Sequence, residues 1–352
     1  MGATSVGPVD QPVDRRTLTE GAVVIAFVAM IVLAFTCSFI GALHDPSPHG
    51  VPVAVVGPRS MAQAFGRRGE LKPSTVPTRA AAVRSIDRRK VYAAVVVSPS
   101  GVEVLLASAG GPALAQILEK LLPTAVHAMA GPSASVRISD IKPLPASDSR
   151  GTSGFYLVVA LVLAGYMGAA FIGAAFGVKP AGRRIRARIA GIAVLALVVS
   201  SLGIAIVHAI GPLGGHYFPL VGVSMLIVLT VGCVAVALQS ALGVLGTLMS
   251  MLIFVVLGNP SSGGPFSYEL LPGLWRTVGP YLPTGAGVDL VRNISYFSGN
   301  SIGRPLTVMA IWLAVGVTLV VVFSRSRPHG IAMQRDRVAE AEVSIAATTA
   351  SV

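Results

Sequence analysis

Long uncharged hydrophobic runs alternate with polar segments along this chain. Four runs have the length of a membrane crossing, which takes roughly 20 apolar residues: Gly21–Leu43, Phe155–Gly177, Ile189–Ile210 and Leu306–Phe323. A fifth run, Pro219–Leu257, would be about 58 Å long as a single helix, nearly twice the thickness of the hydrocarbon core. We therefore expect this run to form two crossings, and the chain to form six. The turn between these two crossings is expected near Gln239, Ser240 and Gly243.

Residues 44–154 have the pattern of a water-soluble α/β domain. Prolines and charged residues are frequent, and short β-branched runs alternate with helical spacing. We expect Lys90–Ser98 to be an internal strand, and residues 48–145 to fold as a unit around one small sheet. The pattern predicts strands at Val51–Val56, Lys90–Ser98, Val102–Ala107 and Ala134–Ile141, and helices at Arg59–Glu70, Thr78–Arg89 and Gly111–Met129.

Composition and charge place the chain in a membrane and orient it. Hydrophobic residues make up 53% of the chain, charged residues 12%, and the mean hydropathy is +0.75. The net charge of +12 is spread over short segments without a nucleic-acid motif, so we expect no nucleic-acid partner. With the N-terminus inside, the basic residues of short segments fall mostly on the cytoplasmic side, as the positive-inside rule requires.

The resulting prediction is an α-helical polytopic protein of the plasma membrane, with both termini in the cytoplasm. Residues 1–20 are a cytoplasmic tail, residues 21–43 an uncleaved first span, and residues 44–154 an extracytoplasmic α/β domain. Residues 155–325 hold the other five spans, and residues 326–352 form a disordered cytoplasmic tail.

The 259–305 segment, between the last two predicted spans, is too polar to cross the bilayer and too aromatic for an ordinary loop. Its Pro and Gly residues predict two short helices, Ser267–Gly279 and Gly287–Phe297, with a bend at 280–285. The segment can dip into the headgroup region and return; the alternative is an amphipathic loop resting on the surface. Candidate outer-gate residues are Pro260, Gly263, Gly264, Glu269, Arg276, Pro283, Gly285, Asp289 and Arg292.

Several motifs resemble a known family. The turn Asn259-Pro260-Ser261-Ser262-Gly263-Gly264, the later Leu270-Leu271-Pro272 and Tyr281-Leu282-Pro283 are similar to the membrane domain of type-2 ABC exporters. Residues 42–53 and 143–156 resemble the branch that contains the phage-infection-protein-like family and its actinobacterial relatives. The resemblance implies a homodimer or heterodimer that works with a separate ABC ATPase.

In this family, the loop between the second and third spans docks on the ATPase. The matching residues here are Lys179, Arg183, Arg184, Arg186 and Arg188. The alternative, which we prefer, is a plain basic loop that fixes topology. The chain departs from the family at its start, because residues 1–16 are too short and proline-interrupted for an amphipathic helix on the membrane.

The sequence lacks the residues that several other classes of function require. None of the Lys, Arg, Asp and Glu residues lies inside a predicted span, which argues against an ion-coupled transporter. No P-loop, G-x-S-x-G or H-E-x-x-H stretch occurs, so we expect neither an in-chain ATPase nor an enzyme. Cys37 and Cys233 are expected to be buried hydrophobes, and prolines separate His44 from His49, so we expect no metal and no cofactor.

Small residues are dense in the second predicted span, where Gly173 and Gly177 form a G-x-x-x-G. They could pack helices within one chain or form a dimer seam. The leading hypothesis is an export permease for a substrate that the sequence does not identify, with hydrophobic or lipid-linked compounds among the candidates. The alternative is a surface protein that transports nothing and whose outer domain acts as a receptor or as an assembly or secretion partner.

Overall fold

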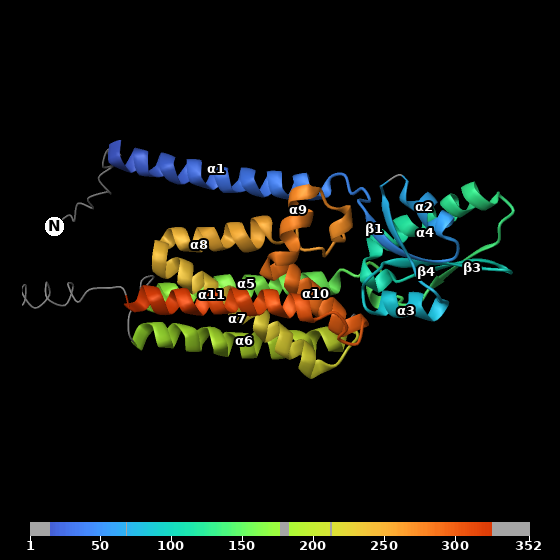
Figure 1. The fold of residues 1–352 in the computed structure, drawn as a ribbon. Coiled ribbons are helices and arrows are strands. Elements are labelled where there is room, and N and C mark those ends of the chain that lie inside the picture. The colour runs from blue at the N-terminus through green and yellow to red at the C-terminus, as the bar shows by residue number, and fades with distance from the viewer. Residues whose placement is uncertain (1–14, 68, 177–182, 212, 326–352) are drawn as a thin grey trace, which may run out of the picture.

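The computed structural model describes residues 15–67, 69–176, 183–211 and 213–325. A bundle of long helices carries the α/β domain at one end, which we call the domain end (Figure 1). At the opposite end, the far end, lie the start of α1 and the end of α11. The long helices are α1 (Arg15–Leu43), α5 (Ser153–Phe176), α6 (Arg183–Ile210), α7 (Tyr217–Leu242) and α11 (Gly303–Arg325).

Each of these five helices contains a stretch long and apolar enough to cross a membrane. The sixth predicted crossing is shorter than expected: α8 (Val244–Met251) continues as a π-helical turn, η3 (Leu252–Leu257). Together they span about 21 Å at 1.5 Å per residue, against about 30 Å of hydrocarbon. The turn before α8 confirms the predicted break, because Gly243 adopts a positive φ of 69° and its N–H closes on the carbonyl of Gln239.

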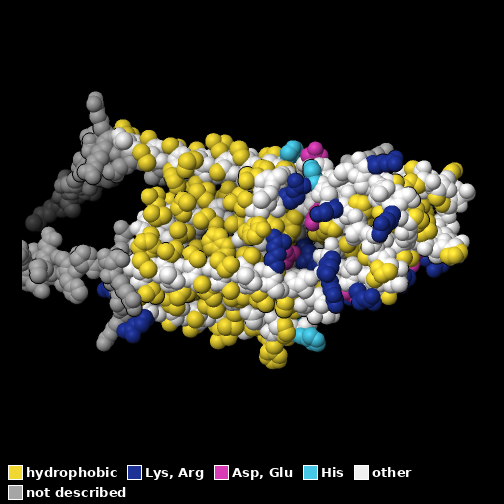
Figure 2. Space-filling view, viewed as in Figure 1, with side chains coloured by type: hydrophobic (Ala, Val, Ile, Leu, Met, Phe, Trp, Pro, Cys, Tyr) yellow, Lys and Arg dark blue, Asp and Glu magenta, His cyan; other side chains and the backbone are white. Residues whose placement is uncertain are grey.

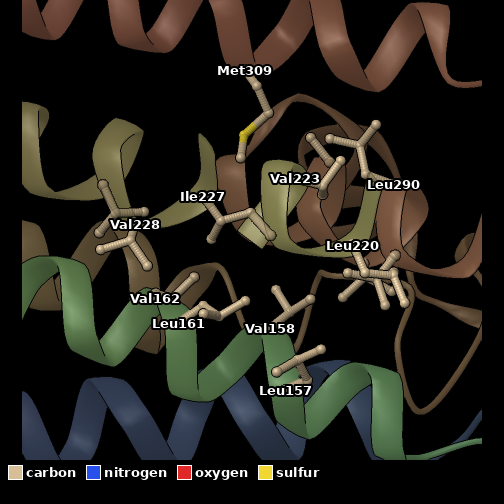
Figure 3. Packing of buried hydrophobic residues seen from close by; sticks show 14 of the residues in the cluster. Leu157, Val158, Leu161, Val162, Leu220, Val223, Ile227, Val228, Leu290 and Met309 are labelled. Carbon is tan, nitrogen blue, oxygen red and sulfur yellow. The ribbon is translucent and has the colours of Figure 1, made fainter. Parts of the chain in front are cut away.

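Helix α7 is the centre of the bundle. It packs against α5, α6, α8, α10 and α11, and 72% of its membrane-length window is buried. Its core contacts include α5 and α10 (Pro283–Tyr296), with Met309 of α11 closing the cluster (Figure 3). The labelled side chains are Leu157, Val158, Leu161, Val162, Leu220, Val223, Ile227, Val228, Leu290 and Met309. The face of the bundle seen in Figure 2 is rich in hydrophobic side chains over most of its length.

Small residues of α5 face other helices of the same chain. A Cβ on Gly165 would lie 2.9 Å from the Cβ of Val231, and one on Gly168 would lie 2.2 Å from Leu195. A Cβ on Gly173 would meet the side chains of Gln239 and Arg188. Of the two uses of the small-residue face, the structure supports packing within one chain; Gly177 lies outside the described residues.

The α/β domain is a five-stranded sheet with helices on both faces. The strand order is β2-β1-β3-β4-β5, with only the β3–β4 pair antiparallel. Helices α2 and α4 cover one face and α3 the other (Figure 1). The strands are β1 (Val51–Val56), β2 (Leu71–Thr75), β3 (Ala93–Ser98), β4 (Gly101–Leu106) and β5 (Val136–Asp140), and the helices are α2 (Arg59–Gly66), α3 (Arg79–Asp87) and α4 (Pro112–Ala130).

Most of this domain was predictable. Strand β3 is internal, as expected for Lys90–Ser98. Strand β2 was missed: Lys72 and Pro73 interrupt its apolar pattern, and only Leu71 is buried. It is an edge strand, where proline is tolerated. Three 3₁₀ turns, at Ser108–Gly110, Ala146–Asp148 and Tyr268–Leu270, complete the connections around the domain.

The 259–305 segment lies between the bundle and the α/β domain. It forms α9 (Gly273–Val278), the 3₁₀ turn Gly279–Tyr281 and α10. The predicted bend at 280–285 is partly wrong, because α10 begins at Pro283 and contains Gly285. Proline at the first helical position suits a helix start, since the missing N–H there has no intrahelical partner.

Helix α1 stands at the edge of the bundle, and only 6% of its membrane-length window is buried. Its described contacts with the 259–305 segment lie near its end. Trp275 donates from Nε1 to the hydroxyl of Ser38 at 3.3 Å, and its ring lies against Gly41, where a Cβ would approach to 2.8 Å. Cys37 is exposed on this helix, which corrects the expectation that it is buried; Cys233 is buried as expected.

Candidate functional site

The turn that leads into the 259–305 segment is buried rather than exposed. Ser261 and Ser262 have no exposed surface, and Pro260 is also buried. Gly263 has φ of 72°, and a Cβ there would lie 2.8 Å from the ring of Tyr268. Gly264 lies against the ring of Phe155 on α5. Both predicted glycines are therefore required by close packing, and Gly263 also by its backbone conformation.

Arg292 on α10 holds this turn from the other side. Its guanidinium donates to the carbonyl oxygens of Gly263, at 3.0 Å, and Gly264, at 3.3 Å, and 8% of the residue is exposed. Burial and the nearby charge of Arg89 lower the pKa of Arg292. The structure thus brings together three of the predicted gate residues through one side chain.

Asp289, one helical turn before Arg292, pairs with a residue of the α/β domain. Arg89 donates from Nη1 to Asp289 Oδ1 at 2.9 Å and to Asn293 Oδ1 at 2.7 Å. The two charged side chains are 12% and 18% exposed. Burial opposes the charge of Arg89, but Asp289, with the nearby Tyr92 and Tyr268, outweighs it and the pKa of Arg89 is raised. This contact connects the α/β domain to α10, the helix of the 259–305 segment that carries Asp289 and Asn293.

The backbone of Arg89 is in an unusual conformation, with φ of 50°. It occupies the position after α3 where glycine is usual: its N–H bonds to the carbonyl of Ile86, and the next N–H bonds to that of Ser85. A non-glycine residue in this region costs on the order of 1–3 kcal/mol. The arginine is thus held by its contacts with Asp289 and Asn293 rather than by backbone preference.

Two tyrosines complete this cluster, the junction network, which comprises Arg89, Tyr92, Tyr268, Glu269, Asp289, Arg292 and Asn293. The hydroxyl of Tyr268 donates to Asp289 Oδ2 at 3.4 Å. Burial and then the charge of Asp289 raise the pKa of Tyr268, while burial and then Glu269 raise that of Tyr92. Both phenols therefore stay protonated at neutral pH and act as hydrogen-bond donors.

A cleft of about 690 Å³ opens beside the junction network. We call it the junction cleft. Its walls come from β1, from the connection between α3 and β3, from the 259–305 segment and from the first residues of α11. It is lined by Pro52, Arg88, Arg89, Lys90, Tyr92, Tyr268, Glu269, Asp289, Asn293, Asn300, Ser301, Gly303, Arg304 and Pro305.

Gly285 packs where two parts of the segment cross. A Cβ there would lie 2.2 Å from the carbonyl oxygen of Gly279 and 2.9 Å from the hydroxyl of Tyr268. The neighbouring Thr284 donates to the carbonyl of Phe254, in the π-helical turn, at 3.1 Å. The first turn of α10 is thereby joined both to the end of α8–η3 and to the rest of the segment.

The predicted gate residues do not all meet. Arg276 lies on α9, half-buried, and among the described residues no hydrogen bond or salt bridge joins it to the junction network. Pro283 starts α10, and Glu269 accepts the N–H of His49 at its backbone carbonyl, 2.9 Å away. The sequence reasoning missed Arg89, Tyr92, Tyr268 and Asn293, because the first two lie in predicted elements outside the segment and nothing local marks any of the four as partners.

The described part of the predicted docking loop, from Arg183 on, lies at the far end. Lys179 is not described, and the side chain of Arg183 is not either. Arg184 and Arg186 are exposed at the start of α6. Arg188 corrects the prediction: it has no exposed surface and donates to the carbonyl of Ala169 at 3.1 Å and to the side-chain oxygen of Gln239.

The position of Arg188 follows from helix α6 starting earlier than predicted. The helix begins at Arg183, so Arg188 lies more than one turn inside it and points at α5 and α7. Gln239 passes the contact on, donating to Thr247 of α8 at 3.0 Å. A basic residue counted with the loop is thus a buried bridge among four helices.

A family model described as ABC-2 family transporter protein matches residues 15–322. The chain belongs to the ABC-2 family transporter proteins. This membership and the five apolar helices indicate a multi-pass membrane protein. Members of the family are membrane components of transporters and are not typically enzymes. No curated protein and no solved structure matches the chain. The narrower resemblance to the phage-infection-protein-like branch stays a prediction.

Proposed function

We propose that this chain is the membrane subunit of an exporter that a separate ABC ATPase energises, and that it works as a dimer in the plasma membrane. The observation that carries the proposal is the family match, which covers the bundle, the α/β domain and the 259–305 segment together. The absence of a phosphate-binding loop from these 352 residues supports a separate ATPase as the energy source. In this arrangement both termini lie in the cytoplasm and the α/β domain lies outside.

The 259–305 segment is the outer gate of this exporter. This role is supported by the position of the segment at the domain end of the bundle. Side chains of its helix α10 contact three neighbouring parts of the molecule. Arg292 holds the 259–264 turn, Thr284 holds the π-helical turn, and Asp289 holds the α/β domain through Arg89. A movement of α10 would therefore displace residues both in the bundle and in the outer domain.

The far end is the coupling end. Arg184 and Arg186 are exposed there and offer a basic surface to an acidic ATPase groove. Arg188 would transmit a displacement of α6 to α7 and α8, because it contacts Gln239, which in turn contacts Thr247. The predicted docking loop would thus provide both a charged surface for the ATPase and a mechanical connection to α7 and α8.

Co-purification tests the proposal. The tagged chain is solubilised from its native membrane in mild detergent, and bound proteins that carry a P-loop are identified by mass spectrometry. We expect one ABC ATPase with the wild type, loss of it with Arg184→Glu/Arg186→Glu, and retention with the control Arg67→Glu/Lys120→Glu on the α/β domain. If the wild type retains no ATPase, the chain is a surface protein whose outer domain serves as a receptor or assembly partner.

A further inference from the structure

The junction cleft concentrates positive charge at one place on the molecule. Arg88, Arg89, Lys90 and Arg304 line it, against the two carboxylates of Glu269 and Asp289. Lys and Arg side chains gather where the hydrophobic bundle meets the α/β domain (Figure 2). The cleft therefore carries an excess of cations that its own acids do not balance.

The excess is available to a ligand. Asp289 is paired with Arg89 at 2.9 Å, and Glu269 lies beside the neutral phenol of Tyr92. Among the described residues, no salt bridge is formed by Arg88, Lys90 or Arg304, and all three are exposed. Arg304 is oriented by the ring of Tyr281, 5.1 Å from its guanidinium carbon.

The backbone fixes these cations in place. The hydroxyl of Ser301 donates to the carbonyl of Arg88, which joins the α10–α11 connection to the end of α3. Arg88 and Lys90 flank Arg89, whose side chain is anchored on α10. Arg88 and Lys90 thus project from a backbone that is bonded to its surroundings, and Arg304 projects from the first turn of α11.

The level of the cleft relative to the membrane indicates the chemistry of its ligand. Gly303, Arg304 and Pro305 line it and are also the first residues of α11, a helix of membrane-spanning length. The first residues of a membrane-spanning helix lie at the level of the lipid headgroups. Arg and Lys bind phosphate oxygens by charge-assisted hydrogen bonds, and 690 Å³ is within the range of small-ligand sites.

We propose that the junction cleft binds a phosphate-bearing anionic group, held by Arg88, Lys90 and Arg304. The source is either the headgroup of an anionic membrane lipid or a free phosphate compound. The site is independent of whether the chain exports anything. Its occupant lies against the Arg89–Asp289 pair and so against the contact between the α/β domain and α10.

Two binding measurements on the purified full-length chain separate the sources. In the first, the protein in nanodiscs of phosphatidylcholine with a small fraction of phosphatidylglycerol is released for native mass spectrometry, and retained phosphatidylglycerol is counted. In the second, inorganic phosphate is titrated by calorimetry in phosphate-free detergent buffer. The test variant is Arg88→Glu/Lys90→Glu/Arg304→Glu, and the control, with the same change of charge, is Arg67→Glu/Arg84→Glu/Lys120→Glu, whose residues are exposed and do not line the cleft.

We expect the test variant to lose at least tenfold in affinity in one of the two measurements, and the control to behave as the wild type. Loss confined to the nanodisc arm assigns a lipid headgroup, and loss in the calorimetric arm assigns free phosphate. Equal binding by the test variant and the wild type in both arms overturns the proposal, as does an equal loss in the control. Because all substituted residues are exposed, unchanged gel-filtration profiles are expected throughout.

Discussion

At the residue scale, single side chains connect parts of the chain that are far apart in sequence. Arg89 reaches Asp289 and Asn293, and Arg292 reaches the carbonyls of Gly263 and Gly264. Each makes more than one hydrogen bond, as a guanidinium can. Arg89 also accepts an unfavourable backbone conformation to do so.

Asp289→Asn should destabilise the protein because it leaves the guanidinium of Arg89 largely buried without a counter-charge. Removing one partner of a buried ion pair costs on the order of 3 kcal/mol. We expect a lower midpoint of thermal unfolding in detergent, measured by intrinsic fluorescence. Glu103→Gln is the matched control: its partner Arg79 is half exposed, so the midpoint should hardly move. Equal midpoints for Asp289→Asn and Glu103→Gln would show that the junction pair contributes nothing.

Three tyrosines predict a response to alkaline pH. Burial raises the pKa of Tyr92 and Tyr268, and burial with the charge of Asp148 raises that of Tyr296 to about 12. The folded protein holds these phenols neutral, whereas the unfolded chain ionises them near 10. Their contribution to stability is therefore present below pH 10 and lost as the pH rises above it. In a titration followed at 295 nm, Tyr268→Phe should leave the folded-state rise unchanged and reduce only the step at unfolding; a smaller folded-state rise contradicts the assignment.

At the element scale, hydrophobic periodicity predicted what is long and regular, and contacts decided the rest. The uncharged runs around Val158 and Ile227 became α5 and α7, and the β-branched run at Val95 became the central strand β3. Helix α8 came out short because it widens into the π-helical turn η3, whose Phe254 carbonyl accepts a hydrogen bond from Thr284, a distant residue. No local pattern encodes such a contact.

The candidate site was predictable only in part for the same reason. The proline and glycine residues of the 259–305 segment mark it, and Asp289 and Arg292 stand out as charges in an apolar context. Their partners are a carbonyl pair and an arginine at the end of α3, which the fold alone brings near. The sequence placed Arg188 in a loop, because a run of basic residues has the same sequence pattern whether its last member is exposed or buried.

Pro283→Ala/Gly285→Ala tests the segment as a gate. The added methyl at Gly285 would press on the carbonyl of Gly279, and overpacking of this kind costs about 1–3 kcal/mol. We expect impaired transport or resistance activity, or a weaker dimer, with membrane insertion unchanged. Gly222→Ala is the control, since nothing lies within 4 Å of the added atom. If the double variant performs as the wild type, the gate assignment is wrong.

At the scale of the whole molecule, the 259–305 segment belongs to both halves. Leu270 is fully buried in the core between the sheet, α2 and α4, and Phe297 is buried in the core on the α3 side. Ala286, Val288, Leu290 and Val291 are buried in the main core of the bundle. The α/β domain is therefore completed by side chains from beyond α5, α6, α7 and α8–η3.

This sharing bears on the isolated domain. We expect residues 48–145 to melt cooperatively, because their two cores are mostly self-contained. Burying a leucine or phenylalanine contributes roughly 1.5–3 kcal/mol, so the absence of Leu270 and Phe297 should make the fragment less stable than the same domain in the full chain. Calorimetry of the fragment measures this. A melt without a cooperative transition would show that the domain cannot fold without the segment.

Thiol labelling in intact cells tests the predicted orientation of the whole chain. Cys37 is exposed and Cys233 is buried, so both are first replaced by serine. Single cysteines then replace Arg79 on the α/β domain and Arg184 or Arg186 at the far end. With the far end in the cytoplasm, a membrane-impermeant maleimide should label position 79 at once and positions 184 and 186 only after permeabilisation. A cysteine at position 188 should react slowly even then, because Arg188 is enclosed by α5, α6 and α7. Labelling of 184 and 186 in intact cells, with 79 protected, would invert the topology and remove the basis for an outer gate.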